Sequence, residues 1–296
     1  MPEEGSVRIS VVIPTLNAGG QIDRLLSLLE KQTVKPEEIL VIDSASTDDT
    51  LEQAAKHFGV KTLTIPRASF NHGGTRDEGV KRTRGEIIIF LTQDAIPASE
   101  QMIEHLTAPL KKDALIIAAY GRQLPRENST ARERLVRMFN YPDRSRVNKK
   151  EDIAEMGIKT FFFSNVCSAY RRQEYLQLGG FETDLLSNED MFFAAKAIRK
   201  GYYTAYIADA QVFHSHDFSL KEQYERNRLQ GYEIERHKQL LEGAFVNREG
   251  VKMLLEVTGN LIRQGRIVEL FGFVTDCAAR YLGSRKGKLD YLKEIS

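Results

Sequence analysis

The chain has 296 residues, of which 42% are hydrophobic, enough for one large domain or one domain with an appendage. Its 42 Lys and Arg nearly balance 41 Asp and Glu, so the net charge of +1 argues against bulk attraction to nucleic acid. Cys167 and Cys277 lie far apart without metal-type spacing, which argues against a disulfide scaffold and favours a reducing, cytoplasmic setting.

The chain start and the hydropathy pattern argue against secretion and membrane spans. The first residues, MPEEGSVRIS, lack the basic start and apolar run of a secretion signal. No apolar stretch approaches the ~20 residues that span a bilayer. We expect a protein that is soluble in the cytoplasm or lies on the inner face of the cell membrane.

Apolar strands alternate with helices in the first third of the chain. Strands are predicted at residues 7–13, 38–46, 61–66 and 86–95. Helical patterns lie between them, at residues 21–32, 46–59 and 75–85. This alternation predicts right-handed βαβ units and a mainly parallel sheet in an α/β fold. The strands are continuously apolar, which is typical of a sheet with helices on both faces.

Polar side chains stand where these strands end. Pro14, Thr15 and Asn17 follow the first strand, Asp43 closes the second, and Asp94 closes the fourth. Ligands of parallel sheets bind beyond the carboxyl ends of the strands. Asp is also common in turns and helix caps. Two carboxylates that each close a buried strand nevertheless favour a binding site at this edge.

The middle of the chain is less regular. Residues 122–156 are rich in Arg and Lys, which predicts a solvated helix and loop or, alternatively, a mobile flap that brings cations to a phosphate. A strand is predicted at 160–172, with the aromatic run 161–163 in the core. GGF (179–181) predicts a tight turn, and 186–201 a helix with an acidic first turn. A strand over 202–216 ends in two histidines.

From residue 219 onward the pattern is helical and charged. We therefore predict a main domain at 1–218 and a helical C-terminal appendage at 219–296. The segment 259–288 mixes apolar and basic residues. Packing on the main domain is the favoured interpretation, and contact with an anionic membrane surface is the alternative.

Several segments, in this order and spacing, resemble the inverting family 2 glycosyltransferases with the GT-A fold. They are SVVIPTLNAG (10–19), VIDSASTDDT (41–50), NHGGTRDEGVKRTRGEIIIFLTQDA (71–95), GGF (179–181) and NED (188–190). Within the family, FNHGGTRDEG and FLTQDAIP look most like bacterial rhamnosyltransferases. The resemblance implies transfer of L-rhamnose from dTDP-L-rhamnose to a saccharide or lipid-linked acceptor in cell-surface polysaccharide synthesis.

The resemblance also assigns a metal site and a donor site. Asp94 would hold Mg²⁺ or Mn²⁺ against the donor diphosphate. Thr92 stands where the family often has a second acid, so His214 is expected as a further ligand, ahead of His216. Asp43 would accept from a pyrimidine N3–H, although Ser44 replaces the acid that usually follows it. The full set expected around the donor is Pro14, Thr15, Asn17, Asp43, Arg76, Gln93 and Asp94.

Two adjacent acids, Glu189 and Asp190, are the candidates for the acceptor side of the site. Asp190 resembles the family's base, which takes a proton from the acceptor hydroxyl as it attacks the anomeric carbon. Glu189 would position Asp190 or contact the acceptor, although acids open many helices. Ser164 and Asn165 would line the acceptor cleft.

Three alternatives remain open from the sequence. The first is a UDP-hexose donor in place of dTDP-L-rhamnose. The second is a nucleotidyltransferase, although PTLNAGGQ lacks the basic residue expected in its glycine-rich loop. The third is a catalytically silent binding protein, which the changed positions Thr92 and Ser44 suggest. An oligomer is compatible with all of these.

Overall fold

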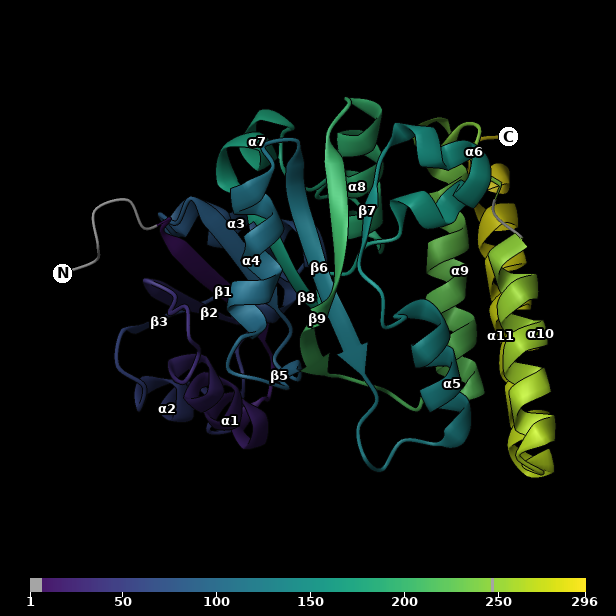
Figure 1. Cartoon of the computed structure of the whole chain (residues 1–296), viewed down its shortest axis with the longest axis horizontal. Helices are drawn as coiled ribbons and strands as arrows, with labels where there is room; N and C mark the ends of the chain where they lie inside the picture. The colour runs from purple at the N-terminus through teal and green to yellow at the C-terminus, as the bar shows by residue number, and fades with distance from the viewer. Residues whose placement is uncertain (1–6, 246–247) are drawn as a thin grey trace.

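A twisted sheet forms the centre of the protein in the computed structural model, which describes residues 7–245 and 248–296 (Figure 1). Nine strands of the described chain build it, in the order β3-β2-β1-β4-β8-β6-β9-β5, with β7 paired to β9. Their bounds are β1 (Ile9–Thr15), β2 (Glu38–Asp43), β3 (Val60–Thr64), β4 (Ile87–Leu91), β5 (Ile96–Pro97), β6 (Ile116–Leu124), β7 (Arg146–Asn148), β8 (Cys167–Arg171) and β9 (Tyr203–Phe213).

Most of the sheet runs in one direction. The strands β3, β2, β1 and β4 pair in parallel, β8 is antiparallel to both β4 and β6, and β6 pairs in parallel with β9. Six strands (β1, β2, β3, β4, β6 and β9) therefore share a direction, and the predicted α/β fold with a mainly parallel sheet is confirmed. The predicted strand at 160–172 shortens to β8, and Phe161 and Phe163 before it are buried, as expected for core residues.

Helices cover both faces of the sheet. The α-helices are α1 (Gly19–Glu30), α2 (Thr50–Ala55), α3 (His72–Arg82), α4 (Met102–Lys112), α5 (Ala131–Asn140), α6 (Ile153–Met156), α7 (Arg172–Gln177), α8 (Glu189–Arg199), α9 (Leu220–Arg236), α10 (Arg248–Arg263) and α11 (Ile267–Glu294). Short 3₁₀ helices are η1 (Arg67–Ser69), η2 (Lys150–Asp152), η3 (Gly157–Phe161) and η4 (Lys238–Leu241). Val11 packs with α1 and α4, whereas Val12 packs with α3 and α8. This alternation explains why the strands are apolar on both sides.

Two helices begin at other residues than the sequence predicted. Asn71 caps α3 by accepting a hydrogen bond from the Gly74 N–H (2.9 Å), so the helix begins at His72. The helix predicted at 46–59 is reduced to α2. Ser46 does not cap it: its hydroxyl donates to Asp43 (2.5 Å) and accepts from the N–H of Asn17 (2.8 Å).

The last three helices form a layer at one end of the molecule, on the right of Figure 1. Ser219 caps α9 at its start through a capping box with Glu222. Glycines allow α9 and α11 to approach closely, since a Cβ at Gly287 would lie 1.8 Å from the Arg228 carbonyl oxygen. Leu261 of α10 and Phe273 of α11 are buried against α5. The tail therefore packs on the rest of the chain, and the division at residue 218 stays a prediction.

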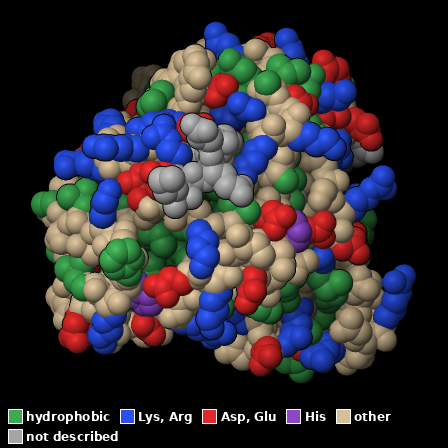
Figure 2. All heavy atoms as spheres, turned by 60° about the vertical axis from the view of Figure 1, so that its left-hand side comes forward, with side chains coloured by type: hydrophobic (Ala, Val, Ile, Leu, Met, Phe, Trp, Pro, Cys, Tyr) green, Lys and Arg blue, Asp and Glu red, His purple; other side chains and the backbone are tan. Residues whose placement is uncertain are grey.

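The surface combines both signs of charge. On the face in Figure 2, Lys and Arg side chains are interspersed with Asp and Glu, in keeping with the net charge of +1. Across residues 7–245 and 248–296, none of the helices combines the length and apolarity that a bilayer crossing needs.

Candidate active site

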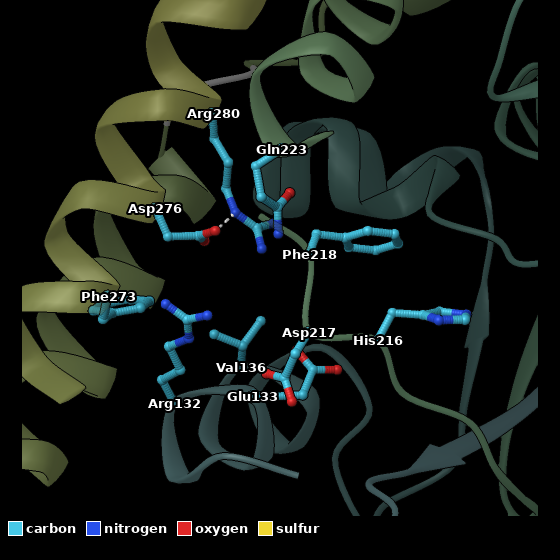
Figure 3. A pocket seen from close by; sticks show the side chains of 10 residues that line it. All are labelled: Arg132, Glu133, Val136, His216, Asp217, Phe218, Gln223, Phe273, Asp276 and Arg280. Carbon is cyan, nitrogen blue, oxygen red and sulfur yellow. Dashed lines mark hydrogen bonds and ion pairs between the residues drawn. The ribbon is translucent and has the colours of Figure 1, made fainter. Parts of the chain in front are cut away.

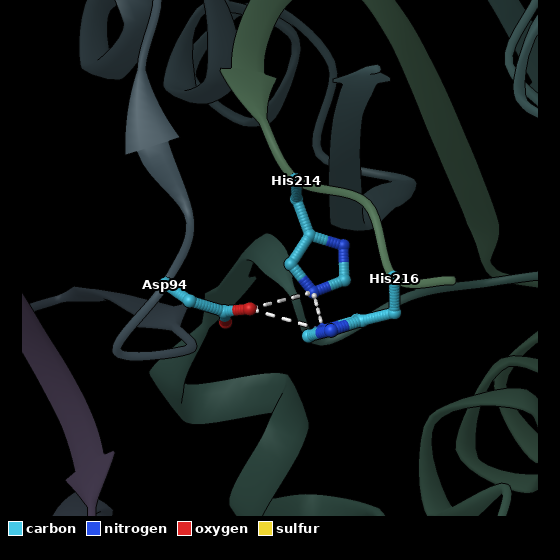
Figure 4. A group of neighbouring side chains, drawn as sticks. All are labelled: Asp94, His214 and His216. Carbon is cyan, nitrogen blue, oxygen red and sulfur yellow. Dashed lines mark hydrogen bonds and ion pairs between the residues drawn. The ribbon is translucent and has the colours of Figure 1, made fainter. Parts of the chain in front are cut away.

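Three potential metal ligands converge beyond the ends of β4 and β9 (Figure 4). Oδ2 of Asp94 lies 3.0 Å from Nε2 of His216 and 3.4 Å from Nε2 of His214, and the two ring nitrogens are 3.1 Å apart. Neighbouring ligands of an octahedral ion with bonds of about 2.1 Å are separated by about 3 Å. The three atoms therefore have the spacing of ligands on one divalent cation. His216, which the sequence ranked below His214, belongs to this group.

A hydrogen bond from Gln123 fixes the tautomer of His214. Oε1 of Gln123 lies 2.9 Å from Nδ1 of His214 and also accepts from Arg137 (2.5 Å). An amide oxygen only accepts, so Nδ1 carries the proton and the Nε2 lone pair faces Asp94. Burial lowers the pKa of His214 to about 3, against the opposing charge of Asp94. His214 is therefore neutral near pH 7, the form that binds metals.

The Asp94 carboxylate remains ionised. Burial by itself raises the pKa of Asp94, but the hydrogen bond with His216 and the nearby His214 outweigh it and hold this pKa well below its usual range. Arg126 lies close as well, with Nη2 3.1 Å from the Asp94 carbonyl oxygen and 3.5 Å from Oδ2. One carboxylate and two imidazoles form a donor set that suits a divalent transition metal.

Hydrogen bonds join the loops that follow β1 and β2. Asp43 is fully buried and accepts from the hydroxyl of Thr15 (3.2 Å) and from the hydroxyl and N–H of Ser46 (2.5 and 2.9 Å). Asn17 donates its N–H to Ser46 (2.8 Å) and accepts from Thr47 (2.9 Å), with φ at 49°, which Asn tolerates. In this structure Asp43 organises the loops, and its contact with a base stays a prediction.

Gln93 links the β1 loop by hydrogen bonds to the metal-ligand group, which consists of Asp94, His214 and His216. Its amide pairs with both backbone groups of Leu16, accepting from the N–H (2.8 Å) and donating to the carbonyl (3.1 Å). Because Gln93 directly precedes Asp94, this pairing fixes the β1 loop beside Asp94. Pro14 lies on β1 opposite Ile42, next to the same loop. Contacts of Gln93 and Pro14 with a donor stay predictions.

The acidic pair opens α8. Oδ2 of Asp190 accepts from the N–H of Asn165 (3.0 Å), and Oδ1 accepts from the N–H of Met191 (2.8 Å). Burial and the negative charge of Glu189 raise the pKa of Asp190 to about 7. A carboxyl group with this pKa is well matched to taking a proton near neutral pH.

Arg76 and Asn165 both donate hydrogen bonds to Glu189. Arg76 (4% exposed) donates from Nη1 to Glu189 (3.1 Å), and Asn165 (3% exposed) donates from Nδ2 to the same oxygen (3.1 Å). A buried carboxylate is stable only with such partners. Arg76 and Asn165 therefore hold Glu189 in this structure, and their contacts with the diphosphate and the acceptor stay predictions.

A chain of hydrogen bonds joins the metal-ligand group to the acidic pair. Gln123, which contacts His214, donates from Nε2 to the hydroxyl of Ser164 (2.8 Å). The next residue, Asn165, donates its N–H to Asp190. Ser164 therefore stands between the two halves of the site. Asp94 and Asp190, far apart in sequence, belong to one connected polar network at the sheet edge.

Comparison with known proteins assigns the family. The sequence model described as "Glycosyl transferase family 2" matches residues 10–178, more than half of the chain. The chain belongs to glycosyl transferase family 2. The O-antigen chain rhamnosyltransferase RfbN of Salmonella typhimurium is 42% identical over 221 residues, which cover 74% of this chain and 70% of the relative. WbaN of Salmonella anatum, with the same description, is 37% identical over 219 residues (73% and 69%).

Solved structures confirm the predicted GT-A glycosyltransferase fold of this family 2 chain. The mannosyltransferase PcManGT of Pyrobaculum calidifontis, in complex with GDP-Man and Mn²⁺, has a TM-score of 0.67 and 16% identity, and covers 100% of this chain and 90% of its own. Residues 1–349 of Staphylococcus aureus TarS, with UDP-GlcNAc, have a TM-score of 0.58 and 21% identity (97% and 90%). Family membership decides against the nucleotidyltransferase alternative.

A pocket lies beside the metal-ligand group of this family 2 enzyme, between α5, the segment after β9, α9 and α11 (Figure 3). Its lining residues are Arg132, Glu133, Val136, His216, Asp217, Phe218, Gln223, Phe273, Asp276 and Arg280. His216 belongs to both the pocket and the metal-ligand group. The other lining residues were not expected from the sequence.

Gln123 and Arg126 were also missed, although a signal for Gln123 exists. Both fall in the stretch predicted as a solvated helix and loop. The apolar run ALIIAAYG at 114–121 precedes them and forms most of β6. With a strand predicted there, the sheet-edge rule that selected Asp94 would also have selected Gln123.

The raised pKa of Asp190 predicts a pH dependence. We expect kcat/KM for sugar transfer to rise with pH through about 7 and to level off above it, because the carboxyl must lose its proton to act as a base. Initial rates at constant metal concentration across neutral pH test this. A rising limb at the ordinary pKa of aspartic acid would contradict the assignment.

Proposed function

We propose that this family 2 enzyme transfers L-rhamnose, with inversion, from dTDP-L-rhamnose to a saccharide acceptor during cell-surface polysaccharide synthesis. The observation that carries this proposal is the polar network that places Asp94, His214 and His216 at one end and Asp190 at the other. Such a transfer needs a site for the leaving diphosphate and a base for the acceptor hydroxyl. The two relatives described as rhamnosyltransferases support the choice of sugar.

The chain's own residues would perform the proton transfer. Asp190 accepts the proton of the acceptor hydroxyl as its oxygen attacks the anomeric carbon from the side opposite the diphosphate, so one displacement inverts the configuration. The N–H groups of Asn165 and Met191 hold the carboxylate in place. Burial, together with the negative charge of Glu189, which is paired with Arg76, keeps the pKa of Asp190 high enough for this task.

The fit of the metal-ligand group favours Mn²⁺ over Mg²⁺. A cation held by Asp94, His214 and His216 would neutralise charge on the diphosphate as it leaves. Mg²⁺ prefers oxygen ligands and retains its waters, whereas imidazole suits later divalent ions. His216 thus supplies a ligand where Thr92 replaces the family's second acid.

A donor panel tests the sugar and the nucleotide separately. We expect dTDP-L-rhamnose with Mn²⁺ to raise the Tm of the protein more than dTDP-glucose or UDP-glucose does, because binding to the folded state alone shifts Tm. The same panel, run as turnover to free nucleotide, should show the same order. A preference for UDP-glucose would overturn the dTDP-rhamnose donor, but would leave the transferase activity standing.

Three further expectations accompany this proposal. They are a saccharide or lipid-linked acceptor, attachment of the enzyme at the inner face of the cell membrane, and an oligomeric state. A lipid-linked acceptor would bring the enzyme to the membrane surface. Co-sedimentation with vesicles of anionic lipid measures that association directly.

A further inference from the structure

An arginine from the C-terminal helices reaches the candidate active site. The guanidinium carbon of Arg226, on α9, lies 4.3 Å from the centre of the Phe218 ring. That ring lies 5.2 Å from the ring of His216, at 32° to it. Arg226 is therefore stacked on the residue that backs the metal-ligand group.

The charge of Arg226 also reaches His72, the first residue of α3. Burial lowers the pKa of His72, Glu189 opposes this, and the positive charges of Arg76 and Arg226 lower it further. His72 opens α3, and its carbonyl accepts from Arg76, which in turn donates to Glu189. Arg226 thus lies within electrostatic range of His72, at the start of α3, as well as close to His216.

Within residues 7–245 and 248–296 Arg226 forms no ion pair at contact distance, although Glu222, one turn earlier on α9, attracts it electrostatically. Among the residues that the structure describes, no carboxylate forms an ion pair with it and no side chain accepts its hydrogen bonds, and its side chain is exposed. Its charged neighbours are paired, Arg137 with Glu133 and Arg280 with Asp276. Although the residue is exposed as a whole, the groups packed around its guanidinium lower the pKa of Arg226 by desolvation. Repulsion from Arg280 and Arg137 lowers this pKa further, and Glu222 opposes these effects. A crowded cation of this kind is stabilised when an anion binds.

The acids of the neighbouring pocket do not pair with Arg226. In Figure 3 Arg280 reaches Asp276, and the lining of the pocket contains acids to match its arginines. Those acids are Glu133, Asp217 and Asp276. Arg226, on α9, has no acid at ion-pair distance in the part of the chain that the structure describes.

We propose that Arg226 binds a phosphate oxygen of the substrate, so that the C-terminal helices complete the active site. The inference rests on the proposed function. Two substrates carry such a phosphate: the nucleotide sugar, in its diphosphate, and a lipid-linked acceptor. The experiment below distinguishes them. A guanidinium can bind either one with two parallel hydrogen bonds, which Lys cannot reproduce.

The test compares Arg226→Gln and Arg226→Lys with the wild-type chain. The matched control is Lys221→Gln, which removes a positive charge from an exposed position of the same helix. Affinities for dTDP, thymidine, inorganic pyrophosphate and octyl phosphate are measured by calorimetry with Mn²⁺, after Tm has shown that each variant is folded.

We expect Arg226→Gln to weaken the binding of a phosphate probe about 10- to 100-fold, the range for charge-assisted hydrogen bonds. The affinity for thymidine should not change. If Arg226→Gln loses affinity for dTDP and pyrophosphate, Arg226 binds the diphosphate of the donor. If it loses affinity for octyl phosphate alone, Arg226 binds the phosphate of the acceptor. Arg226→Lys should recover only part of the affinity. Equal affinity of wild type and Arg226→Gln for every phosphate probe would overturn the inference. A wild-type chain that binds pyrophosphate through Arg226 but ignores dTDP-L-rhamnose would instead overturn the proposed function.

Discussion

Replacement of Asp190 by asparagine is expected to lower kcat for sugar transfer by ~10²- to 10⁴-fold, the usual contribution of a positioned base. Asparagine has nearly the same shape and can still accept a hydrogen bond from Asn165 or Met191, so the start of α8 should be preserved. It cannot take a proton. Donor affinity should change little, because Asp190 lies at the opposite end of the polar network from Asp94. The measurement combines kcat for transfer with the Kd of the nucleotide.

A matched control separates loss of the base from loss of a negative charge. Asp209 is an exposed acid on β9, and Asp209→Asn should keep wild-type activity. The rising limb near pH 7 should also vanish from the residual rate of Asp190→Asn. A variant that transfers sugar at the wild-type rate would show that another group accepts the proton, with Glu189 the next candidate because it is the adjacent acid.

The sequence was sufficient to predict the sheet and the residues that end its strands. Buried strands have a strong apolar pattern, and parallel strands bring their carboxyl ends to one edge by geometry alone. Asp94 and His214 could therefore be expected near each other although 120 positions separate their numbers (214 − 94). The direction of β8 could not be predicted, because its apolar pattern is the same in either orientation.

The partners of buried polar side chains were not predictable in the same way. Arg76 has the sequence context of an ordinary helix charge, and only the packing of α3 against α8 brings it to Glu189. Asn165 follows the aromatic run 161–163 and was expected to line the acceptor cleft. In the fold it is enclosed and accepts hydrogen bonds from Ser168 (2.9 Å) and Tyr170 (2.7 Å). Such pairings depend on contacts between distant segments, which local patterns do not encode.

Replacement of Asp94 by asparagine is expected to abolish Mn²⁺ binding and to lower transfer at least ~100-fold, because charge neutralisation by a metal is worth several kcal/mol. Removing the carboxylate leaves two imidazoles and the positive Arg126 around the site, with no negative charge to attract a cation. Calorimetric titration with Mn²⁺, in the absence of substrate, measures the binding step alone. Retained binding in Asp94→Asn would place the metal elsewhere.

The two histidines should differ in their effects, and this difference tests the geometry of the group. His214 is buried and fixed by Gln123, whereas the His216 side chain is 41% exposed. His214→Ala should therefore weaken Mn²⁺ binding more than His216→Ala does. Gln123→Leu should weaken it about 10- to 100-fold without removing a ligand, because the tautomer of His214 is no longer fixed. His105→Ala, which removes a histidine from α4, serves as the control. Equal affinity in Gln123→Leu and wild type would mean that His214 presents Nε2 without this hydrogen bond.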